Sequence, residues 1–184
     1  MTRVPDGHGP QDWSPDNPVP PPLPPAHLRD PGDAWVYAES GQKYWGAFGA
    51  AGVLVWHRDH GVLLQHRAAW SHNGGTWGIP GGARRQGENA VAGALREAHE
   101  EAGVPHDGVT VLHEFVVTMP VIDGEWTYTT VVVEAHEWFE PSINDAESIA
   151  LEWVAIDEVD ARALHPGFAA SWPTLRQFLD EQSR

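Results

Sequence analysis

The chain has 184 residues, 41% of them hydrophobic, which is enough for one domain with a sizeable core. Its formal net charge of −15 opposes binding to duplex DNA or RNA, although cations could still bridge it to a small phosphorylated substrate. The sequence contains no cysteine, which excludes disulfides and thiolate zinc sites, and it shows neither a signal peptide nor an apolar run of about 20 residues. We therefore expect a soluble, cytoplasmic protein with no membrane partner.

The first 32 residues differ in composition from the rest and include the run SPDNPVPPPLPPAH. A proline-rich segment with few apolar side chains favours polyproline II or disorder over a packed core. We therefore divide the chain into an extended arm at residues 1–32 and one folded domain at residues 33–184. The arm is either a flexible surface segment or a segment that packs on the partner subunit of a homodimer through Trp13 and Leu23.

Apolar runs separated by turn residues predict two β-hairpins and one further strand in the domain. The first hairpin turns at the sequence RDHG, where Gly61 can adopt a positive φ, and the second turns at Asp123-Gly124. The expected strands cover residues 47–57, 61–67, 109–119, 125–135 and 148–156. Because strands dominate and helices are few, the fold class is α/β or α+β with a mixed β-sheet.

A central helix is predicted at residues 89–102 and a closing helix at 167–182. Asn89 can cap the start of the central helix, and Gly103 suits the left-handed position after its end. The closing helix follows Pro166, and Pro173 is an alternative position for its first turn. The apolar stripe of the central helix is formed by Val91, Leu95, Ala98 and Ala102.

The central helix also carries three glutamates on one side. Glu97, Glu100 and Glu101 lie at i, i+3 and i+4, a spacing at which like charges repel and oppose helix formation. An ordinary solvated face would more often include lysine, and this helix has none. A Mg²⁺ ion resolves the conflict because it binds carboxylate oxygens, and the backbone carbonyl of Gly81 could add one more ligand. Arg96 is expected to orient Glu97 or to tie Glu88 to the helix.

The residues around this helix resemble the Nudix box, G-x5-E-x7-R-E-U-x-E-E-x-G-U with U apolar. Gly82, Glu88 and the run Arg96 to Val104 match every specified position. The resemblance extends over residues 46–160 in the order of hairpin, glycine loop, helix and later strands. It implies an α/β/α sandwich with a catalytic loop-helix-loop. It also implies Mg²⁺- or Mn²⁺-assisted hydrolysis of a nucleoside diphosphate linked to another moiety X.

The resemblance also assigns roles within the motif. Glu100 and Glu101 would be the principal metal ligands, and Glu97 would be a further ligand or the group that activates water. Gly81 would supply its carbonyl oxygen to the metal. The residues that would hold the site together are Gly82, Glu88, Arg96 and Gly103.

Five residues outside the motif are candidates with a plainer alternative. Glu147, six residues before Trp153, is a candidate general base or additional ligand, or else a solvated loop carboxylate. Each of Arg67 and Arg84 either contacts substrate phosphate or is an ordinary surface arginine. Trp77 and Trp126 either stack on a nucleobase or fill the core.

Three functions are compatible with these features: an active hydrolase, a Nudix-fold module that senses a nucleotide without cleaving it, and an interaction protein that acts through the arm. The intact motif favours the hydrolase. The substrate favoured is (d)NTP-like, ahead of ADP-ribose or a nucleotide sugar, because the core is compact. The sequence carries no signature that selects one nucleotide.

Overall fold

A computed structural model describes residues 29–183 of the chain. The proline-rich arm expected at residues 1–32 therefore lies almost entirely outside the described residues, as do Trp13 and Leu23. The division into arm and domain stays a prediction. Within residues 29–183, no helix is both long and apolar enough to cross a membrane.

The central element is a seven-stranded mixed sheet with the order β5-β4-β3-β8-β7, in which β6 pairs with β3 and β9 pairs with β4. The pairing of β3 with β8 is parallel and the other pairings are antiparallel. Both predicted hairpins, β3–β4 and β7–β8, are confirmed, as is the mixed sheet. The strands are β3 (Ala50–His57), β4 (Gly61–Arg67), β5 (Trp77–Gly78), β6 (Gly81–Ala83), β7 (Val109–Val121), β8 (Gly124–Ala135) and β9 (Ser148–Val154).

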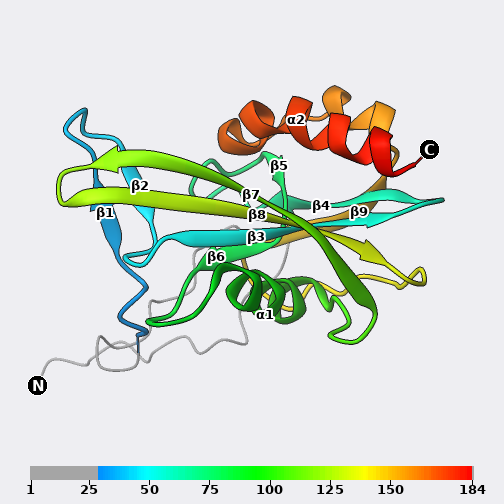
Figure 1. The fold of residues 1–184 in the computed structure, drawn as a ribbon, viewed down its shortest axis with the longest axis horizontal. Helices are drawn as coiled ribbons and strands as arrows, with labels where there is room; N and C mark the ends of the chain where they lie inside the picture. Colours follow the sequence, from blue (N-terminus) through cyan, green and yellow to red (C-terminus); the bar gives the residue numbers. More distant parts are fainter. Residues whose placement is uncertain (1–28, 184) are drawn as a thin grey trace, which may run out of the picture.

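The helices α1 (Ala90–Ala102) and α2 (Pro166–Gln182) cover opposite faces of the sheet (Figure 1). One apolar cluster lies between the sheet and α1, and a second cluster, which includes Trp56 and Trp172, lies between the sheet and α2. This arrangement confirms the predicted α/β/α sandwich.

Helix α1 begins and ends where its sequence indicates. The side chain of Asn89 accepts a hydrogen bond from the amide of Ala92, and Gly103 adopts a left-handed φ of 68°. The buried stripe runs through Ala94, Ala98 and Ala102, whereas the predicted members Val91 and Leu95 are only partly buried at its edge. Alanine at the centre of the stripe leaves little side-chain bulk between the helix and the sheet.

Helix α2 corrects the alternative that placed its first turn at Pro173. The helix begins at Pro166, and His165 caps it by accepting a hydrogen bond from the amide of Gly167. Pro173 lies inside the helix and is exposed. Its neighbours Trp172 and Leu175 are buried, and their packing on the sheet offsets the missing backbone hydrogen bond.

Strands β3 and β4 separate after a short contact. They pair only at Trp56 with Val62 and at His57 with Gly61. Further along, β3 pairs with β6 while β4 pairs with β5 and β9. The sheet therefore divides, and one residue from each side of the division, Gln65 on β4 and Gly81 on β6, donates a hydrogen bond to Glu101 of α1.

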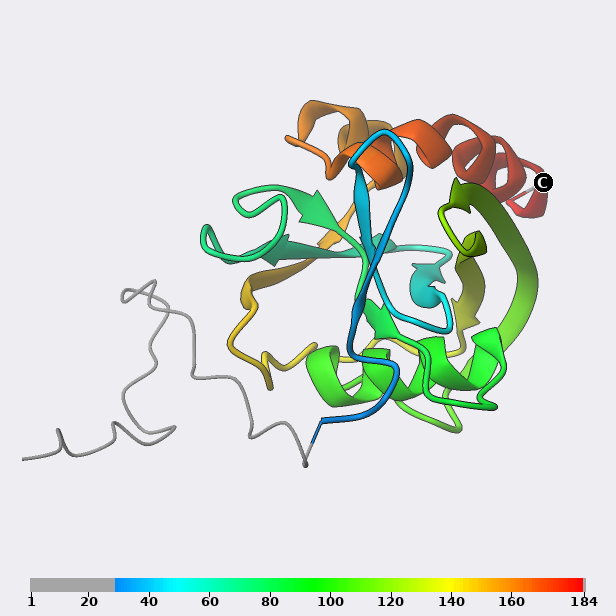
Figure 2. The ribbon, with the colours of Figure 1, turned by 90° about the vertical axis from the view of Figure 1, so that its left-hand side faces the viewer.

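Five elements were not predicted from the sequence, and two of them, β5 and β6, lie in the glycine-rich stretch before α1. Strands β1 (Trp35–Tyr37) and β2 (Lys43–Trp45) form a separate two-stranded sheet. A 3-10 helix at Ile156–Ala161 follows β9, which ends two residues before the predicted position. Figures 1 and 2 place the β1–β2 hairpin at the end of the molecule where the β7–β8 turn lies.

Candidate active site

Arg96 lies at the centre of the acidic face of α1. Its Nη1 donates to Glu97 Oε1 at 2.6 Å and to Glu100 Oε2 at 3.3 Å. Glu97 is largely enclosed, with 18% of its side chain exposed, whereas the side chain of Glu100 is 51% exposed. The arginine thus holds together two carboxylates that would otherwise repel each other.

The same arginine clamps the loop before the helix. Its Nε and Nη2 each donate to one oxygen of Glu88 at 2.9 Å, and Nη2 also donates to the carbonyl of Ala83 at 3.3 Å. The hydrogen bonds from Arg96 lower the pKa of Glu88 to about 2. Because the pair is bidentate and mostly enclosed, it fixes the loop relative to α1.

Gly82 lets the enclosed carboxylate of Glu97 approach the loop. A Cβ atom at position 82 would lie 2.8 Å from the carboxyl carbon of Glu97, closer than side-chain atoms come in proteins. Burial raises the pKa of Glu97, and the adjacent Arg96 partly opposes this rise. Any larger residue at position 82 would push Glu97 out of its place.

Glu101 lies where the sheet divides, and within residues 29–183 it forms no ion pair with a basic side chain. Its Oε2 accepts hydrogen bonds from the Gly81 amide at 3.1 Å and from Gln65 Nε2 at 3.3 Å. Burial raises the pKa of Glu101 well above its usual value, and the negative charge of Asp145 raises it further. A cation beside this carboxylate would remove the cost of burying its charge.

Gln65 is a site residue that the sequence analysis missed. It is 1% exposed and also donates from Nε2 to Ser148 Oγ at 2.7 Å, while its Oε1 has no hydrogen-bond partner. A polar residue at the end of the apolar run GVLLQ was the available signal. Its partner Glu101 lies 36 positions away, so the contact depends on the tertiary fold.

Glu147 and Arg67 lie together, since Arg67 ends β4 and Glu147 directly precedes β9, which pairs with β4. Arg67 Nη2 lies 3.5 Å from Glu147 Oε2, and the backbone carbonyl of Glu147 accepts from the Ala68 amide at 2.6 Å. Burial raises the pKa of Glu147, and Arg67 opposes this rise. The negative charge of Glu147 also contributes to the raised pKa of Glu101, so the two carboxylates lie close enough to interact.

The other three candidates outside the motif make different contacts. Arg84 donates from Nε and Nη2 to the carbonyl of Glu88, which ties it to the loop. Trp77 is 8% exposed and stacks on His66 with ring centroids 4.5 Å apart. Trp126 is 9% exposed and stacks on Tyr44 at 4.7 Å. Both tryptophans thus have packing roles, and their contacts with substrate stay predictions.

The donor groups of this region suit a hard divalent cation, because they are carboxylate and backbone oxygens beside an uncompensated buried carboxylate. Within residues 29–183, no three acidic or histidine side chains are arranged so that they could bind one metal ion together. In this arrangement Arg96 binds both Glu97 and Glu100. Metal binding at this face would require these two glutamates to turn from the arginine.

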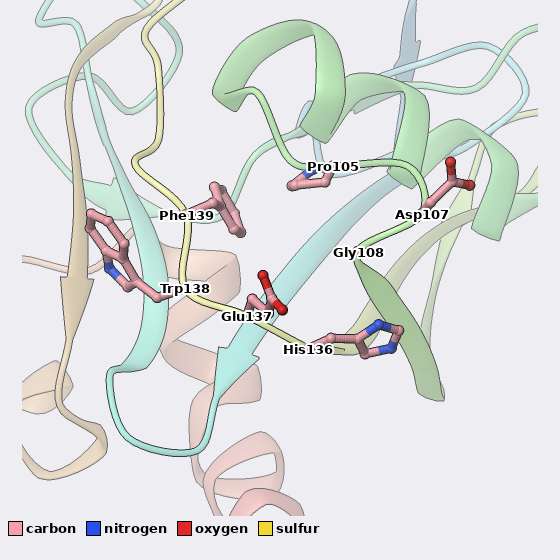
Figure 3. A pocket seen from close by; sticks show the side chains of 7 residues that line it. All are labelled: Pro105, Asp107, Gly108, His136, Glu137, Trp138 and Phe139. Carbon is pink, nitrogen blue, oxygen red and sulfur yellow. The ribbon is translucent and has the colours of Figure 1, made fainter.

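A cavity of about 380 Å³ lies elsewhere, between the loop after α1 and the segment after β8 (Figure 3). Its wall contains none of the predicted site residues. The residues that line it are Pro105, Asp107, Gly108, His136, Glu137, Trp138 and Phe139. The acidic face of α1 is therefore identified by its chemistry and not by the shape of a deep cavity.

Comparisons with known proteins agree on one family. The NUDIX domain model matches residues 47–178. A Mycobacterium tuberculosis (strain H37Rv) protein, described provisionally as 8-oxo-dGTP diphosphatase 3, is 50% identical over 166 residues, which cover 85% of this chain and 76% of that protein. A Bifidobacterium longum nucleoside triphosphate pyrophosphatase/Nudix hydrolase fusion protein is 43% identical over 86% of this chain and 34% of its own length.

The similarity extends to solved structures. The M. smegmatis Nudix hydrolase RenU is 47% identical with a TM-score of 0.76, over 82% of this chain and 96% of that chain. A Caenorhabditis elegans Ap4A hydrolase shares the fold at 18% identity and a TM-score of 0.58, over 72% of this chain and 98% of that chain. The chain therefore belongs to the Nudix family and is a hydrolase of phosphorus-containing anhydrides.

Proposed function

We propose that this hydrolase is a Mg²⁺-dependent pyrophosphohydrolase of nucleoside triphosphates. The observation that carries the proposal is the buried carboxylate of Glu101, which accepts a hydrogen bond from the amide of Gly81 and has acidic neighbours but no basic partner in the described part of the chain. A protein with a net charge of −15 needs such a cation to hold an anionic substrate.

In this proposal Glu100 and Glu101 bind the metal, and Glu97 is a further ligand or activates the water. The carbonyl of Gly81 supplies another oxygen. When bound, Mg²⁺ or Mn²⁺ would neutralise phosphate charge and lower the pKa of the attacking water. Arg96 would hold the loop in place through Glu88 while the other glutamates turn toward the metal.

Glu147 is the proposed general base or additional ligand. Its raised pKa brings it closer to neutral pH, where a base accepts a proton most effectively. Its partner Arg67 lies 3.5 Å away and would contact a substrate phosphate. Loss of that ion pair on substrate binding would free Glu147 to contact water.

The relatives favour an oxidised deoxynucleoside triphosphate as substrate. The M. tuberculosis relative, 50% identical, carries the name of an 8-oxo-dGTP diphosphatase. This name supports the (d)NTP-like class over ADP-ribose and nucleotide sugars. Hydrolysis between two phosphates would release a nucleoside monophosphate and pyrophosphate, or a nucleoside diphosphate and phosphate.

A substrate panel with Mg²⁺ tests the proposal. It would contain 8-oxo-dGTP, the dNTPs, ADP-ribose, nucleotide sugars and dinucleoside polyphosphates, with phosphate and mononucleotide release as the measurement. We expect 8-oxo-dGTP to have the highest kcat/KM. If the wild-type chain hydrolysed none of these compounds, the proposal would be disproved. A clear preference for ADP-ribose would make ADP-ribose the substrate in place of a nucleoside triphosphate.

Glu100→Gln tests the metal ligands in the same assay. This exposed side chain contributes little to packing, so the variant should fold with an unchanged circular dichroism spectrum and lose activity by at least about 100-fold. Glu181→Gln, an exposed glutamate of α2, is the matched control and should retain full activity. Full activity of Glu100→Gln would contradict the assignment.

A further inference from the structure

The β1–β2 hairpin has one face packed on the sheet. Tyr44 stacks on Trp126 of β8, and Trp126 Nε1 donates to the carbonyl of Gly46 at 2.9 Å. The amide of Ile122 donates to the carbonyl of Tyr37 at 2.8 Å, which ties the hairpin to the β7–β8 turn. These contacts hold the hairpin in one position beside the sheet.

The opposite face of the hairpin carries aromatic rings and a cation. Trp35 and Trp45 are cross-strand partners with ring centroids 5.0 Å apart, and Lys43 Nζ lies 4.3 Å from the centroid of Trp35. Tyr37 and Trp45 are 51% and 37% exposed. We call Trp35, Tyr37, Lys43 and Trp45 the aromatic face.

Lys43 is unusual among the cations of this chain. It is the only lysine in the sequence, and within residues 29–183 it forms no ion pair with a carboxylate. Its observed partner is the ring of Trp35. In a chain with a net charge of −15, an exposed ammonium without a carboxylate partner is available to an electron-rich ligand.

A chain of contacts connects the aromatic face to the candidate active site. The Trp35 ring lies 5.3 Å from the His72 ring, and Arg67 Nε donates to the His72 carbonyl at 3.3 Å. Arg67 in turn lies 3.5 Å from Glu147. Figure 2 shows the hairpin running across the front of the sheet, with the loop after β4 on one side and β7 on the other. A ligand that contacts Arg67 through its phosphates would thus extend toward the aromatic face.

We propose that the aromatic face binds the nucleobase of the substrate, and this inference rests on the proposed function. Exposed rings such as that of Trp45 provide stacking surface, and base–aromatic stacking is a major term in nucleotide binding. Lys43 donates hydrogen bonds and accepts none, so it suits the oxygen and nitrogen acceptors at the edge of a nucleobase. The hairpin precedes residues 47–178, the range that the family model matches.

The test compares Trp45→Ala and Lys43→Met with wild type on 8-oxo-dGTP and on deoxyribose triphosphate, which lacks the base. We expect each variant to raise KM for 8-oxo-dGTP about tenfold with kcat within twofold, because the lost contact is distant from the reacting phosphates. Neither variant should change KM for deoxyribose triphosphate. Trp138→Ala, which removes a tryptophan that is 48% exposed beside the remote cavity, is the matched control and should behave as wild type.

The remaining outcomes would each contradict the inference or the proposed function. Unchanged KM in both variants, or an equal rise for the base-free compound, would overturn the inference and leave the proposed function intact. A change in sedimentation coefficient with unchanged KM would show that the face is a subunit contact and would equally overturn it. Trp45→Phe should restore most of the affinity if stacking is the cause. A wild-type chain that hydrolyses no nucleotide would fail the proposed function before any variant is measured.

Discussion

Glu88 and Glu101 lie near the two ends of the Nudix motif and differ in their partners and in the direction of their pKa shifts. Each accepts a hydrogen bond from a backbone amide, Glu88 from Arg85 and Glu101 from Gly81. Glu88 also has the bidentate partner Arg96, and its pKa falls to about 2. Glu101 has none, and burial with acidic neighbours raises its pKa.

The difference separates a carboxylate that stabilises the fold from one that, in our proposal, binds a cation. A neutralised, hydrogen-bonded pair gains nothing from Mg²⁺, whereas a buried carboxylate without a basic partner gains both charge compensation and a ligand. Both glutamates belong to one sequence motif, so the motif itself does not separate the two roles. Their surroundings in the fold do.

Glu101→Gln should have the largest effect on activity. Removing a proposed metal ligand is expected to lower kcat/KM by about 10³-fold. The metal-free protein should be as stable as wild type or more so, because glutamine removes a buried charge. Thermal unfolding with EDTA and with Mg²⁺ checks this: Mg²⁺ should stabilise wild type and leave the variant unchanged. Wild-type activity in the variant would contradict the proposed role of Glu101 as a metal ligand.

Local patterns made much of α1 and of the two main hairpins predictable. Asn89, Gly103 and the turn sequences act within a few residues, so their signals are visible in the sequence. The strands of β1 and β2 have three residues each, too few to show a period. The contact of Gln65 with Glu101 and the continuation of α2 through Pro173 depend on packing between distant segments.

Glu88→Gln should lower the stability of the folded protein, in contrast to Glu101→Gln. The fall of its pKa from 4.5 to about 2 means that the ionised, paired side chain stabilises the fold, by about 1–2 kcal/mol once solvent screening is included. Because the folded pKa is lowered, this contribution is complete above pH 4.5 and is lost as the pH falls toward 2. Urea unfolding of wild type and variant should therefore differ by about 1–2 kcal/mol at pH 7, and the difference should shrink below pH 4.5. An equal difference at pH 7 and pH 3 would show that the ion pair is not its cause.

Gln65→Leu gives the smallest and most specific effect, on the affinity for metal. The substitution removes the hydrogen bond that orients Glu101, and the loss of such an outer contact typically weakens metal binding 10- to 100-fold. Stability should fall by about 1 kcal/mol, because Ser148 Oγ loses its buried partner while the Oε1 atom that lacks a partner is also removed. Calorimetric titration with Mn²⁺ measures the affinity without turnover. Ser148→Ala is the graded control, because it removes the other partner of Gln65 and leaves the bond to Glu101 in place. It should weaken binding less than Gln65→Leu, and an equal or larger loss would assign the orientation of Glu101 to the serine.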